Sequence, residues 1–173
     1  SVQYFDLWIG HWDAVSGLAV PAKQLRSDFK AFLYCNTLFR YSSGTNDPPG
    51  SFATFKNNGW LLKNSAGQYI VAGSTEYTVD FGNPAVWSWY ANWINSIVVA
   101  NNLDGVQLDN LKLDAGNAFY YSTVPNAINP RTGGTWTDAD VLNAFIGFVS
   151  TIKNTLGSSK TILGNSIYNG EAN

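Results

Sequence analysis

The sequence predicts an α/β fold in which parallel strands alternate with helices. Short apolar runs typical of buried strands are separated by longer segments, two of which repeat apolar residues with helical spacing. The chain has no internal repeat and no low-complexity run, so this alternation is the main guide to its fold. Strands that alternate with helices form parallel βαβ units, because each helix returns the chain to the starting edge of the sheet.

The first half of the chain is expected to contain two strands, a short helix, a loop and a hairpin. Residues 5–10 and 30–36 are apolar runs that predict buried strands, and residues 17–29 between them predict a poor helix around a proline. Residues 42–51 are rich in Ser, Pro and Gly and predict a loop. Residues 59–71 predict a hairpin with a glycine in its turn.

The second half contains two well-marked helices between three further strands. Asn83 can cap the first helix, and Pro84 suits its first turn. Thr137 can cap the second, and Gly157 is expected to end it in a left-handed conformation. The apolar stripes contain Val86, Tyr90, Trp93, Ile94 and Ile97 in the first helix, and Val141, Phe145, Phe148, Val149, Ile152 and Leu156 in the second. The strands are expected at residues 77–81, 105–109 and 161–165.

Polar residues at the strand ends favour a barrel over an open sheet. Five expected strands are fewer than the eight of a closed barrel, but no Gly-rich phosphate loop supports a nucleotide-binding sheet. In an α/β barrel the carboxyl ends of the strands carry the active site. Here those ends carry Asn36, Asp80, Asp109 and Asn165. The prediction is therefore one domain over residues 1–173, a parallel (β/α) barrel of TIM type that is incomplete in this chain.

Composition and charge narrow the functional classes. Charged residues make up 13% of the chain and aromatic residues 15%, which suits a surface for neutral polar ligands such as sugars but is also typical of extracellular proteins. The net charge of −2 argues against nucleic acid, which requires a basic stripe. No segment approaches the ~18 apolar residues of a membrane span. The single Cys35 excludes an internal disulfide and a multi-cysteine zinc site, and no metal or cofactor is expected.

Asp109 is the main candidate for chemistry. It ends an apolar strand, where an ionised carboxylate is costly unless it is solvated or hydrogen-bonded, so a place at a pocket floor is favoured over a purely structural cap. Asn110 beside it can donate a hydrogen bond to a sugar hydroxyl. Asp80 is expected beside Asp109, although its surroundings are also good turn chemistry. Asp104 precedes the strand and is expected to have a structural role at its opposite end.

A role for Asp109 in cleaving bonds between sugars would require a second carboxyl group, because glycoside hydrolysis uses one carboxyl group as acid and the other as nucleophile or base. The chain has two glutamates, Glu76 and Glu171. Glu171 follows the last strand by six residues. It either reaches over the same mouth as Asp109 or is a solvated loop residue. The partner acid is therefore expected to be Glu171 or a residue beyond position 173.

Further sugar contacts are expected after the first two strands. Trp8 in the first strand, together with the segment that follows residues 5–10, either forms a sugar-contact rim or belongs to a loop packed by tryptophan. The candidate residues are Trp8, His11, Trp12 and Asp13. Tyr34 and Asn36 flank Cys35, and one of them is expected to face the mouth. His11 is the chain's sole histidine and has no His-Glu-x-x-His partner pattern.

Several segments resemble glycoside-hydrolase-like TIM-barrel families of bacteria and archaea, and more remotely the endo-α-1,4-polygalactosaminidases. The segments that carry the resemblance are residues 30–34, 59–67, 79–84, 104–110 and 162–165. Asp104-Gly-Val-Gln-Leu-Asp-Asn110 is the most specific of them. The resemblance implies a (β/α)₈ barrel that acts on a polysaccharide, with Asp109 as a catalytic carboxylate and Asp80 and Asn165 as pocket residues.

Three functions follow as alternatives. The first is an O-glycosyl hydrolase acting on a poly- or oligosaccharide, and the second is a carbohydrate-binding pseudoenzyme. The third is a structural or assembly protein of a fibre or virion surface, in which apolar faces left by missing strands favour self-association. The chain lacks Met and begins in mid-pattern, so we expect a removed leader or a longer parent chain, and an extracellular location.

Overall fold

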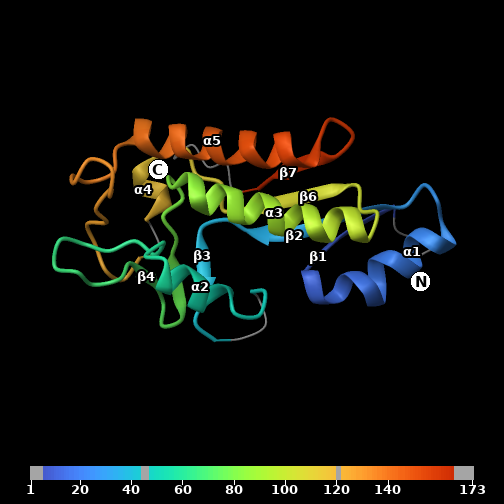
Figure 1. Ribbon diagram of the computed structural model, residues 1–173, viewed down its shortest axis with the longest axis horizontal. Coiled ribbons are helices and arrows are strands. Elements are labelled where there is room, and N and C mark those ends of the chain that lie inside the picture. Colours follow the sequence, from blue (N-terminus) through green and yellow to red (C-terminus); the bar gives the residue numbers. More distant parts are fainter. Residues whose placement is uncertain (1–5, 44–46, 120–121, 166–173) are drawn as a thin grey trace, which may run out of the picture.

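The computed structural model describes residues 6–43, 47–119 and 122–165, and its centre is a four-stranded parallel sheet (Figure 1). The strand order is β1-β2-β6-β7, and all three neighbouring pairs are parallel. The strands are β1 (Leu7–Gly10), β2 (Lys30–Asn36), β6 (Gly105–Asp109) and β7 (Thr161–Gly164). The expected alternation of parallel strands and helices is confirmed.

Two long helices lie side by side along this sheet (Figure 1). They are α3 (Pro84–Ala100) and α5 (Asp138–Leu156). The Asn83 side chain accepts a hydrogen bond from Ala85 N, and Thr137 forms a capping box with Asp140, so both predicted caps are confirmed. Of the predicted stripes, Trp93, Ile97 and Val149 are only partly buried, and the other members are buried.

The end of α5 differs from its prediction. Gly157 has φ 80° and ψ 175°, which is a positive φ with an extended ψ rather than a left-handed helical cap. This region of backbone space is essentially restricted to glycine. The glycine therefore ends the helix as predicted, but its extended ψ leads the chain into the short segment before β7 instead of closing a left-handed cap.

The remaining elements are short. They are α1 (Val20–Leu25), α2 (Ser51–Asn57), α4 (Ala115–Ala118), a 3₁₀ turn (Trp12–Ala14) and a π-helical turn (Val15–Ala19). The helical segment after β1 thus begins and ends earlier than the expected residues 17–29, and Pro21 lies at the start of α1. Lys63 and Tyr69 form an antiparallel bridge, which confirms a local hairpin in residues 59–71.

The predicted strand at residues 77–81 is wrong as a member of the parallel sheet. The chain there forms β5 (Glu76–Thr78), which pairs antiparallel with β3 (Phe39–Tyr41) and β4 (Val71–Ala72) in a second sheet. A turn of three residues joins β4 to β5, and so short a connection permits only antiparallel pairing. The described part of the chain therefore has four parallel strands, not five.

Both edges of the parallel sheet carry exposed apolar side chains. The prediction of a buried first strand is wrong, because β1 is an edge strand and Leu7 and Ile9 are 48% and 42% exposed. At the other edge, Leu142 and Ile146 of α5 line a groove of ≈ 420 Å³ beside Ile162 of β7. Within the described ranges, no helix is long and apolar enough to cross a membrane.

We expect these edges to promote self-association of the isolated chain. An Ile146→Asp variant should shift the chain toward monomer with little loss of stability, because Ile146 is 55% exposed. Multi-angle light scattering across a concentration series measures this shift. Asn154→Asp, at an exposed position of the same helix outside the groove lining, is the matched control for added charge and should leave self-association unchanged. An unmodified chain that is monomeric at every concentration contradicts the expectation.

The Asp104 carboxylate binds groups at the amino-terminal ends of the parallel strands, where it directly precedes β6. It pairs with Lys23 and Lys30 and accepts a hydrogen bond from Ala31 N at 2.9 Å, which confirms its expected structural role. Burial alone would raise the pKa of Asp104, but the hydrogen bonds from Lys23, Ala31 N and Lys30 hold it below its ordinary value. The folded state therefore binds the proton less tightly than the unfolded state does.

This pKa shift predicts acid sensitivity. The stabilisation is fully present above the unfolded-state pKa of about 3.9 and is lost as the pH falls through the lower folded-state value. Asp104→Asn should lower the free energy of unfolding at pH 7 and weaken its dependence on pH below about 4. Urea unfolding at pH 7 and pH 3 measures both effects. An unchanged pH dependence in the variant would show that Asp104 does not cause the acid sensitivity.

Candidate active site

Asp109 lies at the carboxyl end of β6, opposite Asn36 of β2 in the sheet register. Its carboxylate accepts hydrogen bonds from Tyr34, Asn110 and Asn165. Tyr34 Oη donates to Oδ2 at 2.6 Å, and Asn165 Nδ2 and Asn110 N donate to Oδ1 at 2.9 Å each. Tyr34 comes from β2 and Asn165 follows β7, so side chains from both neighbouring strands orient the carboxylate.

Tyr34 is a fixed donor to this carboxylate. Burial, followed by the hydrogen bond to Asp109, raises the pKa of Tyr34 well above its ordinary value. The phenol therefore stays protonated at neutral pH and donates a hydrogen bond to Asp109. The His11 ring lies 4.7 Å from the Tyr34 ring, centroid to centroid, so the segment after β1 also reaches this cluster.

Asn110 and Cys35 have contrasting environments beside Asp109. Asn110 has a φ of 62°, a left-handed conformation that asparagine tolerates, and its Nδ2 lies 3.5 Å from Asp109 Oδ2. It remains half-buried at the mouth. Cys35 is buried on the opposite face of β2, and burial raises the pKa of its thiol to about 12. Such a thiol is unreactive at neutral pH.

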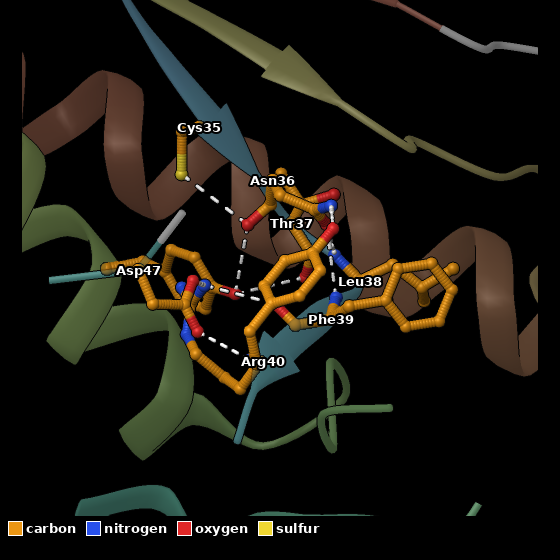
Figure 2. Close-up of polar contacts among 9 residues, drawn as sticks. Cys35, Asn36, Thr37, Leu38, Phe39, Arg40 and Asp47 are labelled. Carbon is orange, nitrogen blue, oxygen red and sulfur yellow. Dashed lines mark hydrogen bonds and ion pairs between the residues drawn. The ribbon is translucent and has the colours of Figure 1, made fainter. Parts of the chain in front are cut away.

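The Asn36 amide is engaged within the protein rather than free for a ligand. Its Oδ1 accepts hydrogen bonds from Leu38 N at 3.0 Å and Phe39 N at 3.1 Å (Figure 2). Its Nδ2 donates to Tyr41 Oη at 3.2 Å. Asn36 thus shapes the turn between β2 and β3. Its predicted substrate contact remains untested.

Asp80 does not end a parallel strand, which corrects the reason for placing it beside Asp109. It is 4% exposed, and its two oxygens accept hydrogen bonds from Arg131 at 2.8 and 3.0 Å. This bidentate pair joins segments 51 residues apart, and no local pattern in the sequence identified Arg131. A role for Asp80 in substrate binding stays a prediction.

The rim expected from Trp8 of β1 and the segment after β1 contacts the cluster through His11. Trp8 and Trp12 are half-buried, and Asp13 is exposed. The Trp8 ring covers Gly10 so closely that a Cβ there would lie 2.2 Å from it. Glu171 lies outside the described residues. Among the residues that the structure describes, no group of three or more His, Cys, Asp and Glu side chains could hold a metal ion.

A chain with this arrangement of parallel strands matches a known family. The model of the glycosyl hydrolases family 31 TIM-barrel domain matches residues 20–162. The chain belongs to glycosyl hydrolase family 31. The expected glycoside-hydrolase TIM-barrel fold is therefore confirmed, whereas the family found is family 31 and not that of the endo-α-1,4-polygalactosaminidases. No curated protein matches the chain.

Solved structures of glycosidases have the same fold as this family 31 chain. An α-galactosidase from Thermus thermophilus in complex with stachyose is 19% identical, with a TM-score of 0.52 over 86% of this chain and 27% of its own. A cycloalternan-degrading enzyme from Trueperella pyogenes is 12% identical, with a TM-score of 0.60 over 89% and 21%. A glucosidase II α subunit is 14% identical, with a TM-score of 0.58 over 92% and 19%.

The match covers much less of these proteins than of this chain. The chain spans about a fifth to a quarter of their lengths. At these identities the likeness shows the fold. The four parallel strands that the structure describes correspond to part of such a barrel, in which eight strands close the sheet.

Proposed function

We propose that this chain takes part in hydrolysis of the O-glycosidic bonds of an oligo- or polysaccharide, with Asp109 as nucleophile or general base. The observation that carries the proposal is the Asp109 carboxylate at the carboxyl end of β6, held by donors from both neighbouring strands. This end of an α/β barrel is where catalytic groups gather. Family membership supports the same class of chemistry.

The proposed reaction needs a second carboxyl group to protonate the leaving oxygen. Glu171, or a residue beyond position 173, is the proposed acid. A separation of about 5–5.5 Å between the two carboxyl groups would give retention of configuration, and one of about 6.5–9.5 Å would give inversion. The low charge of the chain supports a proposed extracellular location.

The direct test is release of reducing ends from defined glycosides. Suitable probes are stachyose and the p-nitrophenyl α-galactoside and α-glucoside, chosen because the similar structures include an α-galactosidase and a glucosidase subunit. Hydrolysis of any probe supports the proposal. Failure of all of them, under conditions in which a family 31 glycosidase cleaves them, counts against it.

A carbohydrate-binding pseudoenzyme is the second candidate. Among the described residues, the donors around Asp109 are a phenol and amides, and no second carboxylate joins them. Phenol and amide groups suit recognition of sugar hydroxyls as well as catalysis. Calorimetry with the same probes distinguishes the two candidates, because binding without release of reducing ends favours the pseudoenzyme.

A further inference from the structure

The orientation of the Asn36 amide is fixed by two backbone groups. Asn36 Oδ1 accepts hydrogen bonds from Leu38 N and Phe39 N, and an amide nitrogen could not accept either of them (Figure 2). The other end of the side chain must therefore be the NH₂ group. This assignment follows from the hydrogen-bond partners alone.

The Asn36 amide determines the direction of the Tyr41 proton. Asn36 Nδ2 donates to Tyr41 Oη at 3.2 Å, so the phenol oxygen is the acceptor in this contact. A phenol also has one proton to donate. No described residue accepts that proton, and Tyr41 is half-exposed. The proton is therefore directed toward solvent on the side of β3 that adjoins Asn36.

The backbone of Tyr41 is held as firmly as its hydroxyl. Tyr41 N donates to Asp47 Oδ2 at 2.7 Å, and Asp47 Oδ1 accepts a hydrogen bond at 2.9 Å from Arg40, whose side chain is 2% exposed. Burial, and then the negative charges of Glu76, Asp47 and Asp109, raise the pKa of Tyr41. The phenol thus remains a donor at neutral pH, within the electrostatic reach of Asp109.

We propose that the Tyr41 hydroxyl donates a hydrogen bond to a hydroxyl oxygen of the glycan bound at Asp109, and that Asn36 acts as its positioning residue. Asn36 lies opposite Asp109 in the sheet register. Its contact with Tyr41 therefore places the phenol at the same carboxyl ends of the strands where Asp109 lies. This inference rests on the proposed function and adds a specificity-determining residue to the same site.

The first test is Tyr41→Phe, which removes one hydroxyl and keeps the ring. We expect the Kd or KM for stachyose and the p-nitrophenyl α-glycosides to rise about 3- to 10-fold, as the loss of one neutral hydrogen bond implies, with kcat little changed. Tyr77→Phe is the matched control, because Tyr77 is also half-buried in the antiparallel sheet but packs against Phe52 and Tyr69. Calorimetry measures Kd, and initial rates separate KM from kcat.

The second test is Asn36→Asp, which keeps an acceptor for Leu38 N and Phe39 N but replaces the NH₂ donor by an acceptor. The Tyr41 proton should then turn toward residue 36 and be lost to the glycan. We expect Asn36→Asp to weaken binding as Tyr41→Phe does, and the double variant to show no further loss. Independent roles of the two residues would give additive losses, and urea unfolding checks that each variant keeps the stability of the unmodified chain, which a purely structural contact would lower.

The outcomes separate this inference from the proposed function. Equal binding by Tyr41→Phe and the unmodified chain overturns the inference but leaves the proposed function standing. Weaker binding by Tyr41→Phe, with unchanged binding by the control Tyr77→Phe, supports the inference even where no probe is cleaved. Additive losses in the double variant overturn the positioning role of Asn36. An unmodified chain that neither binds nor cleaves any probe overturns both proposals.

Discussion

Replacing Asp109 by asparagine is expected to lower glycoside hydrolysis by about 10²- to 10⁴-fold, the usual contribution of a positioned general base. The variant keeps the size of the side chain and replaces one acceptor oxygen by an NH₂ donor. Its oxygen can still accept from Asn110 N and Asn165 Nδ2, and its nitrogen can donate to Tyr34 Oη. The fold should therefore survive, so that the loss reports on the chemistry. Initial rates on the p-nitrophenyl α-glycosides measure it.

Asp104→Asn is the matched control for this variant. It makes the same chemical change at the other end of the same strand, where the carboxylate is paired with Lys23 and Lys30. At neutral pH and a temperature at which it is folded, it should hydrolyse the probes at nearly the unmodified rate. Full activity of the Asp109→Asn variant would contradict the proposal that Asp109 is a catalytic group.

The Asp109 cluster was partly predictable because parallel strands end together. A parallel sheet brings the carboxyl ends of neighbouring strands to one edge, so polar residues at those ends in the sequence must meet in space. Asp109 and Asn165 satisfy this rule, and Tyr34 lies on the face of β2 that alternation assigns to it. The helix caps at Asn83 and Thr137 were also predictable, because a cap depends on residues within one turn.

The rest of the site depends on contacts that no local pattern contains. Asp80 meets Arg131 across 51 residues of sequence, and this pairing required the tertiary structure to become visible. The segment at 77–81 misled the prediction because a short apolar run has the same appearance in a parallel and an antiparallel sheet. The role of Tyr41 depends on which Asn36 atom faces it, and that follows only from the turn at Leu38 and Phe39.

Removing the carboxylate of Asp47 is expected to have the largest effect on stability. Arg40 is 2% exposed, and its guanidinium carbon lies 4.2 Å from the Tyr90 ring centroid and 5.1 Å from that of Phe55. Its ion pair with Asp47 is equally buried, with side chains 2% and 7% exposed. Asp47→Ala would leave a buried cation without its counter-charge, which typically costs about 3–5 kcal/mol. Urea or thermal unfolding measures the loss.

The double variant Arg40→Met with Asp47→Ala decides whether the missing charge causes that loss. Within the described chain, Arg40 Nε and Nη2 have no hydrogen-bond partner, so the guanidinium is already incompletely compensated by its surroundings. Met can fill much of the same aromatic enclosure without a charge. The double variant should therefore be more stable than Asp47→Ala alone. Equal stability of the two would instead assign the loss to the hydrogen bond between Asp47 and Tyr41 N, and hence to the anchoring of β3 beside the candidate active site.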